Sequence, residues 1–322
     1  MIEVEGLTKV YGPRKAIDGL NFNAQQGEIL GFLGPNGAGK TTTMRILSGY
    51  MPPTSGVARI AGLDVVDQSL EVRKRVGYLP ETVPLYHDMT VFSYLKFMAD
   101  LHHVADVEDR VDEVLELVHM EERSESFISS LSKGMRQRIG LAQALIHKPD
   151  VLILDEPTIG LDPVQIVEVR NLIRELGKDH TILLSTHILS EAQQVCNRVL
   201  IINKGKIVVE DSPERLQSRL TGSQRVIVQV AGDDSGFEEL VRKVPGVSLV
   251  NVVQPGRLEF EIRPGMDVRG EVARALVTAG FDLLEFHSVA LSLEDIFMEL
   301  TRDEPEPPSI DAGLEDSETQ VV

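Results

Sequence analysis

One cysteine, Cys196, is all that the 322-residue sequence contains, so no internal disulfide can form and nothing points to an oxidising compartment. Apolar runs are short, and none approaches the ~18 residues that a helix needs to cross a bilayer. The first residues also lack the basic and apolar regions of a signal peptide. These absences lead us to expect a soluble chain in the cytoplasm.

Basic residues are outnumbered, with 32 Lys and Arg against 50 Asp and Glu, which gives a formal charge of −18. Sequence-independent binding to nucleic acid requires a basic face that displaces counterions, so we expect no nucleic-acid partner. Residues 303–322 hold seven carboxylates and no Lys or Arg, so −11 of the charge lies on residues 1–302. We interpret residues 303–322 as an acidic disordered tail, and the length of the rest predicts about two domains.

The clearest chemical signal is a glycine-rich loop between a predicted strand over residues 27–33 and a predicted helix over residues 41–48. It matches the phosphate-loop pattern G-x-x-x-x-G-K-[ST] at every fixed position. Its glycines are expected to take positive φ and bring N–H groups close to a triphosphate. Lys40 would reach the β- and γ-phosphates, and the Thr41 hydroxyl would hold Mg²⁺. The predicted ATP-binding residues here are Gly34, Pro35, Asn36, Gly37, Ala38, Gly39, Lys40, Thr41 and Thr42. An incidental turn with a surface lysine is the alternative.

Two adjacent acids, Asp155 and Glu156, follow an apolar run over residues 151–154. Such a run is typical of a strand buried on both faces of a parallel sheet, with its carboxyl end at the edge where ligands bind. Adjacent residues of a strand point to opposite sides, so we expect different roles for the two acids. Asp155 would assist Mg²⁺ beside Thr41, and Glu156 would polarise the water that attacks the γ-phosphate. A charged strand terminus facing solvent is the alternative.

Two single residues are placed near this edge by the strands that precede them. His187 follows a predicted strand over residues 181–186 and would lie beside Asp155, although a lone histidine at a strand end is often structural. Tyr11 begins the turn between the two predicted strands of a hairpin, residues 2–10 and 16–22. Its ring either stacks on an adenine or is that of an ordinary turn tyrosine.

Residues 82–149 are predicted to form an α-helical insertion, because apolar residues recur at spacings of three and four over residues 91–98 and 111–118. Near its end, Ser132 is placed as the N-cap of a helix over residues 136–147. Ser132, Lys133 and Gly134 would then present N–H groups and a cation as a second anion-binding site. A capped helix without a ligand is the alternative.

Residues 222–301 are predicted to form a second unit. Its segments follow the order β-α-β-β-α-β, with strands at 225–230, 247–253, 258–262 and 281–288 and helices at 237–244 and 268–278. This order favours a small α+β, ferredoxin-like domain, and residues 292–300 are predicted to form an amphipathic helix. The unit holds no metal-ligand cluster and no nucleophile beside a base, so we interpret it as a structural or contact domain.

Together, these motifs resemble those of an ATP-binding-cassette ATPase, the nucleotide-binding subunit of an ABC transporter, over residues 1–217. The resemblance implies an α/β fold, a P-loop NTPase core of ABC type with an N-terminal antiparallel β region and the helical insertion. It also implies a role for each motif. Residues 34–41 would be Walker A and residues 151–155 Walker B, with Glu156 as the catalytic glutamate, Asp162 in the D-loop, His187 as the switch histidine and Tyr11 as the adenine-stacking residue. The signature loop, which contacts the ATP bound by the other subunit (in trans), would consist of Leu131, Ser132, Lys133, Gly134 and Met135.

The sequence departs from the commonest cassette pattern at two places. The signature loop reads LSKGM where LSGGQ is usual, so that Lys133 replaces a glycine and Met135 a glutamine. The loop that normally carries a glutamine as Mg²⁺ and partner contact has Glu81. Both variants resemble the ABC-2-like, single-cassette branch, in which many subunits are linked to export.

The resemblance implies an Mg²⁺-dependent ATPase that forms a homodimer, or a dimer with a related cassette subunit, around two ATP molecules. A separate transmembrane permease would hold it at the cytoplasmic face of the membrane, with Tyr86, His87 and Met89 as candidate contacts. One alternative is a soluble ABC ATPase that acts on ribosomes or DNA. A nucleotide-binding scaffold without turnover is another, which the presence of Lys40, Glu156 and His187 disfavours.

Overall fold

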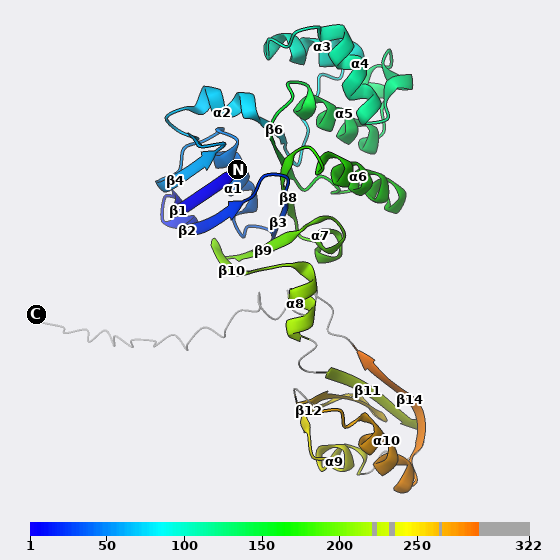
Figure 1. Ribbon diagram of the computed structural model, residues 1–322. Coiled ribbons are helices and arrows are strands. Elements are labelled where there is room, and N and C mark those ends of the chain that lie inside the picture. Colours follow the sequence, from blue (N-terminus) through cyan, green and yellow to red (C-terminus); the bar gives the residue numbers. More distant parts are fainter. Residues whose placement is uncertain (221–223, 232–235, 264–265, 290–322) are drawn as a thin grey trace, which may run out of the picture.

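The computed structural model describes residues 1–220, 224–231, 236–263 and 266–289. Figure 1 shows the elements arranged around three β-sheets. In the described residues, no helix has the length and apolar character needed to cross a membrane. The predicted helix over residues 292–300 and the predicted tail over residues 303–322 lie outside the described residues.

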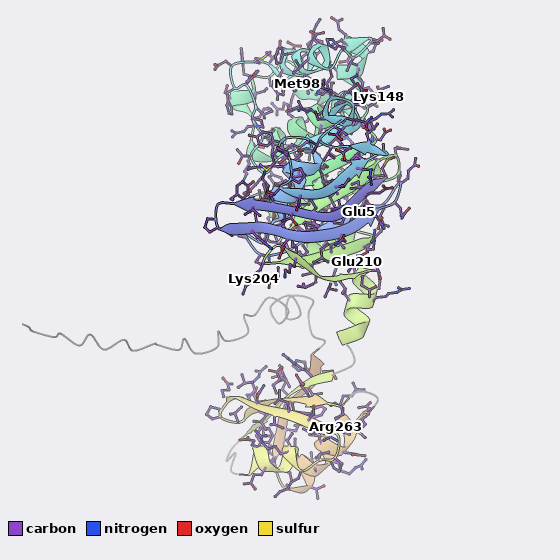
Figure 2. All side chains as sticks on the ribbon, turned by 90° about the vertical axis from the view of Figure 1, so that its left-hand side faces the viewer. Glu5, Met98, Lys148, Lys204, Glu210 and Arg263 are labelled. Carbon is purple, nitrogen blue, oxygen red and sulfur yellow. The ribbon has the colours of Figure 1, made fainter. Side chains whose placement is uncertain are left out.

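The first sheet is antiparallel and has the strand order β2-β1-β4-β5. Its strands are β1 (Ile2–Tyr11), β2 (Arg14–Ala24), β4 (Ser55–Ile60) and β5 (Leu63–Asp64). β1 and β2 form the predicted hairpin, which closes with Tyr11 paired to Arg14. Along the start of β1, buried Ile2 and Val4 alternate with exposed residues such as Glu5 (Figure 2), as a strand with one solvated face requires.

The second sheet has the order β10-β9-β3-β8-β7-β6, and all its pairs are parallel except β10 with β9 at one edge. Every residue of β3, β7 and β8 is buried. This confirms the prediction that the strand leading to Asp155 is buried on both faces of a parallel sheet. β9 and β10 were not identified from the sequence. The six strands are β3 (Ile29–Leu33), β6 (Val76–Leu79), β7 (Val151–Asp155), β8 (Thr181–Thr186), β9 (Arg198–Asn203) and β10 (Lys206–Asp211).

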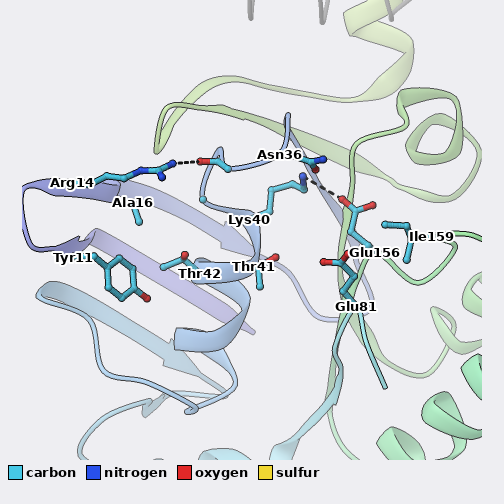
Figure 3. Close-up of a pocket in the computed structure, with 12 residues that line it drawn as sticks. Tyr11, Arg14, Ala16, Asn36, Lys40, Thr41, Thr42, Glu81, Glu156 and Ile159 are labelled. Atoms are coloured by element: carbon cyan, nitrogen blue, oxygen red, sulfur yellow. Dashed lines mark hydrogen bonds and ion pairs between the residues drawn. The ribbon is translucent and has the colours of Figure 1, made fainter. Parts of the chain in front are cut away.

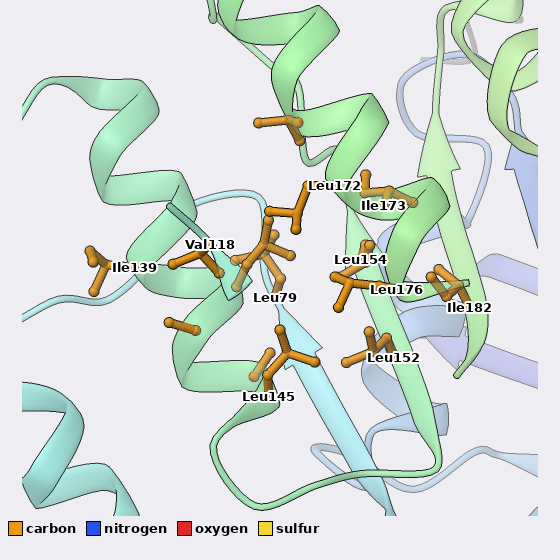
Figure 4. Packing of buried hydrophobic residues seen from close by; sticks show 14 of the residues in the cluster. Leu79, Val118, Ile139, Leu145, Leu152, Leu154, Leu172, Ile173, Leu176 and Ile182 are labelled. Atoms are coloured by element: carbon orange, nitrogen blue, oxygen red, sulfur yellow. The ribbon is translucent and has the colours of Figure 1, made fainter. Parts of the chain in front are cut away.

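Alternate residues of β7 enter two separate cores. Leu152 and Leu154 pack against α5 and α6 on one face (Figure 4), whereas Val151 and Ile153 join the core beneath the first sheet. Glycine at position 31 lets α7 approach β3, because a Cβ there would lie 2.8 Å from Sγ of buried Cys196. The helices next to this sheet are α1 (Lys40–Leu47), α2 (Ser69–Arg75), α6 (Pro163–Leu176), α7 (Leu189–Val195) and α8 (Pro213–Leu220).

Between β6 and β7 the chain is helical, as the apolar spacing predicted. It forms α3 (Val91–Leu101), α4 (Val107–Leu117), η1 (Glu121–Arg123), η2 (Ile128–Ser130) and α5 (Lys133–Leu145). The hydroxyl of Ser132 caps α5 by accepting a hydrogen bond from the Met135 N–H at 3.3 Å. Because this cap fixes the helix start, α5 begins at Lys133 and not at residue 136 as predicted.

The remaining elements form a third, antiparallel sheet of order β12-β13-β11-β14 with two helices. They follow the predicted order: β11 (Gln224–Ala231), α9 (Phe237–Arg242), β12 (Val247–Gln254), β13 (Arg257–Ile262), α10 (Arg269–Thr278) and β14 (Asp282–Val289). Side chains from α9 and α10, including Val241 and Val272, bury with Val228 and Phe260 of the sheet. This small unit therefore has its own hydrophobic core.

Candidate active site

The phosphate loop connects β3 to α1, and its glycines act in two ways. Gly37 and Gly39 have φ of 79° and 114°, in the region where a side chain is strained. Gly34 was also expected at positive φ, but this prediction was wrong because it has no positive φ. It is required for a different reason, since a Cβ there would lie 2.5 Å from the carbonyl oxygen of Ile202 in β9. The loop is thus held against the sheet.

A cavity of about 560 Å³ opens beside this loop, and Figure 3 shows the side chains around it. It lies between the β1–β2 hairpin, the start of α1 and the loops that follow β6 and β7. Gly34, Pro35 and Ala38 support the loop and do not line the cavity. The lining residues are Tyr11, Arg14, Ala16, Asn36, Gly37, Gly39, Lys40, Thr41, Thr42, Glu81, Glu156 and Ile159.

Glu156 is the centre of the polar contacts at this cavity. Its Oε1 lies 3.2 Å from Nζ of Lys40, and its Oε2 lies 2.8 Å from Nδ1 of His187. The Nζ of Lys40 also donates to the carbonyl oxygen of Gly34 at 2.7 Å. Lys40 and Glu156 are each only 5% exposed. The structure therefore brings together the three residues that were predicted to carry catalysis.

The side chains of Asp155 and Glu156 point in different directions, but not because adjacent residues of one strand alternate, as was predicted. β7 ends at Asp155, and Glu156 has a left-handed φ of 51° that turns its side chain out of the strand pattern. The backbone N–H of Glu156 donates to Oγ of Ser185 at 3.0 Å, which anchors this turn to β8. The carboxylates of the two residues consequently have separate partners at one edge of the sheet: Ser185 for Asp155, and Lys40 and His187 for Glu156.

Asp155 is fully buried and accepts a hydrogen bond from Oγ of Ser185 at 2.5 Å. Burial raises the pKa of its carboxyl, and the hydrogen bond from Ser185, followed by the nearby Thr41 hydroxyl, opposes the shift. In the described part of the chain, its Oδ2 has no hydrogen-bond partner. A buried, unpaired carboxylate oxygen beside a threonine hydroxyl suits a hard cation, so these residues fit Mg²⁺. Glu81 is exposed and lies across the cavity from Thr41.

The signature loop lies outside this cavity. Leu131 is buried, while Ser132, Gly134 and Met135 line a second cavity of about 510 Å³. Gly134 lies against the side chain of Gln165 in α6, whose Cδ would be 2.6 Å from a Cβ at this position. Lys133 reaches instead toward Gly160 in the loop after β7. One chain thus does not bring its signature loop to its own phosphate loop.

Asp162 and Tyr11 are both found at structured positions. Asp162 is the N-cap of α6 and accepts hydrogen bonds from the N–H groups of Val164 and Gln165 at 3.0 and 2.9 Å. Tyr11 is part-exposed at the cavity, and its hydroxyl donates to Sδ of Met51 at 3.0 Å. Both positions are compatible with the D-loop and adenine-stacking roles, which stay predictions.

Arg14 lines the cavity and was missed in the sequence. Its Nη2 donates to the carbonyl oxygen of Gly37 at 3.4 Å, so that it ties the hairpin to the phosphate loop. The available signal was its place in the hairpin turn directly after Tyr11-Gly-Pro.

Two family descriptions match the chain. The ABC transporter family matches residues 17–159, and the C-terminal domain of DrrA1-3-like ATP-binding proteins matches residues 212–301. The bacitracin transport ATP-binding protein BcrA of Bacillus licheniformis is 37% identical over 93% of this chain and 97% of its own length. The daunorubicin resistance ATP-binding protein DrrA3 of Streptomyces coeruleorubidus is 35% identical, over 94% and 96%.

Solved structures show the same fold. An ATP-binding subunit of an ABC transporter is 31% identical with a TM-score of 0.62, covering 69% of this chain and 93% of that chain. MJ0796, a bacterial ABC transporter cassette, is 23% identical with a TM-score of 0.61, covering 66% and 99%. With similarity to BcrA and DrrA3 over nearly the whole length, the chain belongs to the ABC transporter ATP-binding proteins and is an ATP-hydrolysing cassette subunit of the branch that includes them.

Proposed function

We propose that two copies of this chain, or one copy and a related cassette subunit, enclose two ATP molecules. Each ATP would lie between the phosphate loop of one subunit and Ser132 to Gly134 of the other. The observation that carries this proposal is the separation of the two cavities, because each contains only part of the predicted ATP contacts. A second subunit supplies the missing part.

Within each site, Glu156 accepts the proton of the attacking water and His187 orients Glu156 and contacts the γ-phosphate. Lys40 binds the β- and γ-phosphates after leaving its ion pair with Glu156. Thr41 and Asp155 would hold Mg²⁺, with Glu81 opposite, and the ion would neutralise phosphate charge when bound. Catalysis in this arrangement comes from positioning and charge stabilisation, without a covalent intermediate.

The dimer powers export through a separate transmembrane permease, which places the chain at the cytoplasmic face of the cell membrane. BcrA is named for bacitracin transport, DrrA3 for daunorubicin resistance and LnrL of Bacillus subtilis for linearmycin resistance. These names support an export role for a chain that is similar to all three over more than 90% of its length. The chemical identity of the exported compound does not follow from the residues described.

The loop after Glu81 and the helix α3 form the surface that contacts the permease. Tyr86 is 55% exposed, and its ring packs against Tyr94 and Phe97 of α3 with centroids 5.8 and 5.9 Å away. Met89 was expected to be exposed, but it is half-buried and packs on the helical core. Glu81 lines the cavity and lies five residues before Tyr86. One short segment therefore joins the nucleotide cavity to the surface that would contact the permease, as coupling between ATP hydrolysis and transport requires.

Cysteine crosslinking in cells tests this assignment, with Tyr86→Cys or His87→Cys in a Cys196→Ser background. We expect a crosslink to a membrane protein and co-fractionation with membranes. Glu5→Cys, on the exposed face of the first sheet, is the matched control and should give no such crosslink. A protein that yields no membrane crosslink and instead sediments with ribosomes would support the soluble alternative.

We assign the cassette to residues 1–217, its helical insertion to residues 82–149 and an accessory domain to residues 222–301. Strand order β12-β13-β11-β14 with all neighbours antiparallel supports a ferredoxin-like topology for the accessory domain. In the described residues, no group of three or more His, Cys, Asp or Glu could hold a metal ion. A contact role without chemistry therefore fits this domain best.

A further inference from the structure

Glu191, in the first turn of α7, is a buried acid to which neither the motifs nor the proposed mechanism assign a role. It is 7% exposed. Its Oε2 accepts hydrogen bonds from Oγ1 of Thr158 at 2.6 Å and from Oγ1 of Thr186 at 3.3 Å. Both threonines are also buried. One carboxylate oxygen thus joins two hydroxyls from different segments of the chain.

The two segments are those that carry the reactive side chains. Thr158 lies two residues after Glu156, and Thr186 directly precedes His187. The last ladder pair between β7 and β8 is Asp155 with Ser185, so regular strand pairing ends before either reactive residue. Beyond that point, Glu191 is a bridge between the two segments that does not use the side chain of Glu156 or His187.

The Thr186 hydroxyl extends this bridge to the backbone on the far side of His187. It accepts a hydrogen bond from the N–H of Ile188 at 3.0 Å while it donates to Glu191. His187 is therefore flanked on both sides by contacts that lead to one glutamate. Movement of α7 relative to β7 would displace the imidazole from the carboxylate of Glu156.

Burying the Glu191 carboxyl lowers the stability of the folded protein. A buried carboxyl without a cation costs free energy that hydroxyl hydrogen bonds offset only in part. Within the described residues, no Lys, Arg or His lies within ion-pair distance of Glu191. An apolar side chain would fill the same space at lower cost, so packing does not explain an acid here.

We propose that Glu191 is a positioning residue for ATP hydrolysis, which keeps the segments of Glu156 and His187 in register. Its contribution is greatest once ATP has bound, because Lys40 then leaves Glu156 for the phosphates. Apart from the turn contact that its carbonyl oxygen accepts from the Ile159 N–H, the remaining contacts of Glu156 lead to Ser185 and His187, which both lie on the segment that the Glu191 bridge fixes. Glu191 itself does not touch the cavity.

The test compares Glu191→Ala with Glu191→Gln in the full chain, by steady-state hydrolysis of MgATP. We expect Glu191→Ala to lower kcat about 10- to 100-fold with KM for ATP changed less than about 2-fold, because displacements near 1 Å cost turnover on this scale. KM for ATP should change little because Lys40 and Tyr11, which would bind ATP, lie on elements that the Glu191 bridge does not contact. Glu191→Gln should restore most of kcat, since its amide oxygen accepts the same two bonds. Glu175→Ala, an exposed glutamate of α6, is the matched control.

Thr158→Val is a second variant that tests the same bridge, and it can be used even if Glu191→Ala does not fold. It removes one hydroxyl at nearly constant volume and should lower kcat in the same direction. Combined with Glu191→Ala, its effect should not be additive, because both changes break one bridge. Full kcat in Glu191→Ala, or equal losses in the Ala and Gln variants, would overturn the proposal. So would a loss confined to KM.

Discussion

Lys40 and Glu156 form a buried ion pair, with Nζ 3.2 Å from Oε1. The Lys40 amine is the same group that is expected to bind the β- and γ-phosphates, so it cannot keep Glu156 as its main partner once ATP is present. On the proposed mechanism, arrival of the phosphates would free the carboxylate at the moment when it is needed as a base. Before that, the pair satisfies two charges whose separate burial would be costly.

Replacing Glu156 with Gln should lower the rate of ATP hydrolysis about 10²-fold or more, the scale of general-base assistance. ATP binding should be retained or strengthened, because Lys40 loses a competing anion. Phosphate release and a nucleotide titration measure the two effects. Glu175→Gln on α6 is the control, and unchanged turnover in Glu156→Gln would remove this residue from the mechanism.

Ser132→Arg should block ATP-dependent dimerisation while a monomer still binds ATP, because Ser132 lies in a cavity separate from the phosphate loop. The measurement is sedimentation of the Glu156→Gln protein with MgATP, with and without the second change. Ser130→Arg, an exposed neighbour in η2, should leave dimerisation intact. If the Glu156→Gln protein is monomeric at every concentration, the two-subunit site is contradicted.

Asp155→Asn should stabilise the fold while it abolishes hydrolysis. Burial raises the pKa of Asp155, so the folded state favours the neutral carboxyl. That contribution to stability is present at low pH and is lost as pH rises through the folded pKa. At neutral pH the neutral amide removes this cost, so Asp155→Asn should unfold at a higher Tm than the wild type.

Thermal unfolding without nucleotide, at pH 7.5 and pH 4.5, checks this expectation. The gain from Asp155→Asn should shrink at the lower pH, where the wild-type carboxyl is closer to its neutral form. A variant that is less stable than wild type at both pH values would contradict the account.

The stability of the cassette should fall as pH drops from about 6.5 to 4, in part through His147. Its ring is part-buried and stacks on His102 with centroids 4.1 Å apart, and its Nε2 lies 3.1 Å from the carbonyl oxygen of Val76. Burial, followed by the nearby His102, lowers the pKa of His147 to about 4. Burial also lowers the pKa of His102.

The sign follows from the unfolded chain, which takes up a proton near pH 6.5 while folded His147 stays neutral. Its contribution to stability is therefore complete above pH 6.5 and is lost as pH falls toward 4, with a slope of at most about 1.4 kcal/mol per pH unit. His147→Gln should flatten the curve of urea midpoint against pH. His87→Gln, an exposed histidine, should leave the slope unchanged.

The phosphate loop, the Ser132 cap and the element order of the small C-terminal unit were predictable because each depends on residues close in sequence, whereas β9 and β10 were missed. Gly34 was misjudged because its constraint is a contact with Ile202, 168 positions away in the chain. The turn at Glu156 depends on Ser185 in another strand and leaves no local pattern. Glu191 was overlooked for the same reason, since one glutamate in a short helix carries no periodic signal.

Cys196 is buried against Gly31 between α7 and β3, so the reactivity of its thiol reports local opening of the cassette at this position. Burial raises the pKa of its thiol to about 12, so almost none of it is thiolate while the fold is closed. A soluble thiol reagent can then react only during openings that separate α7 from the sheet. Its rate of modification measures how often those openings occur, and ATP should slow it if nucleotide tightens the edge where Glu156 and His187 meet.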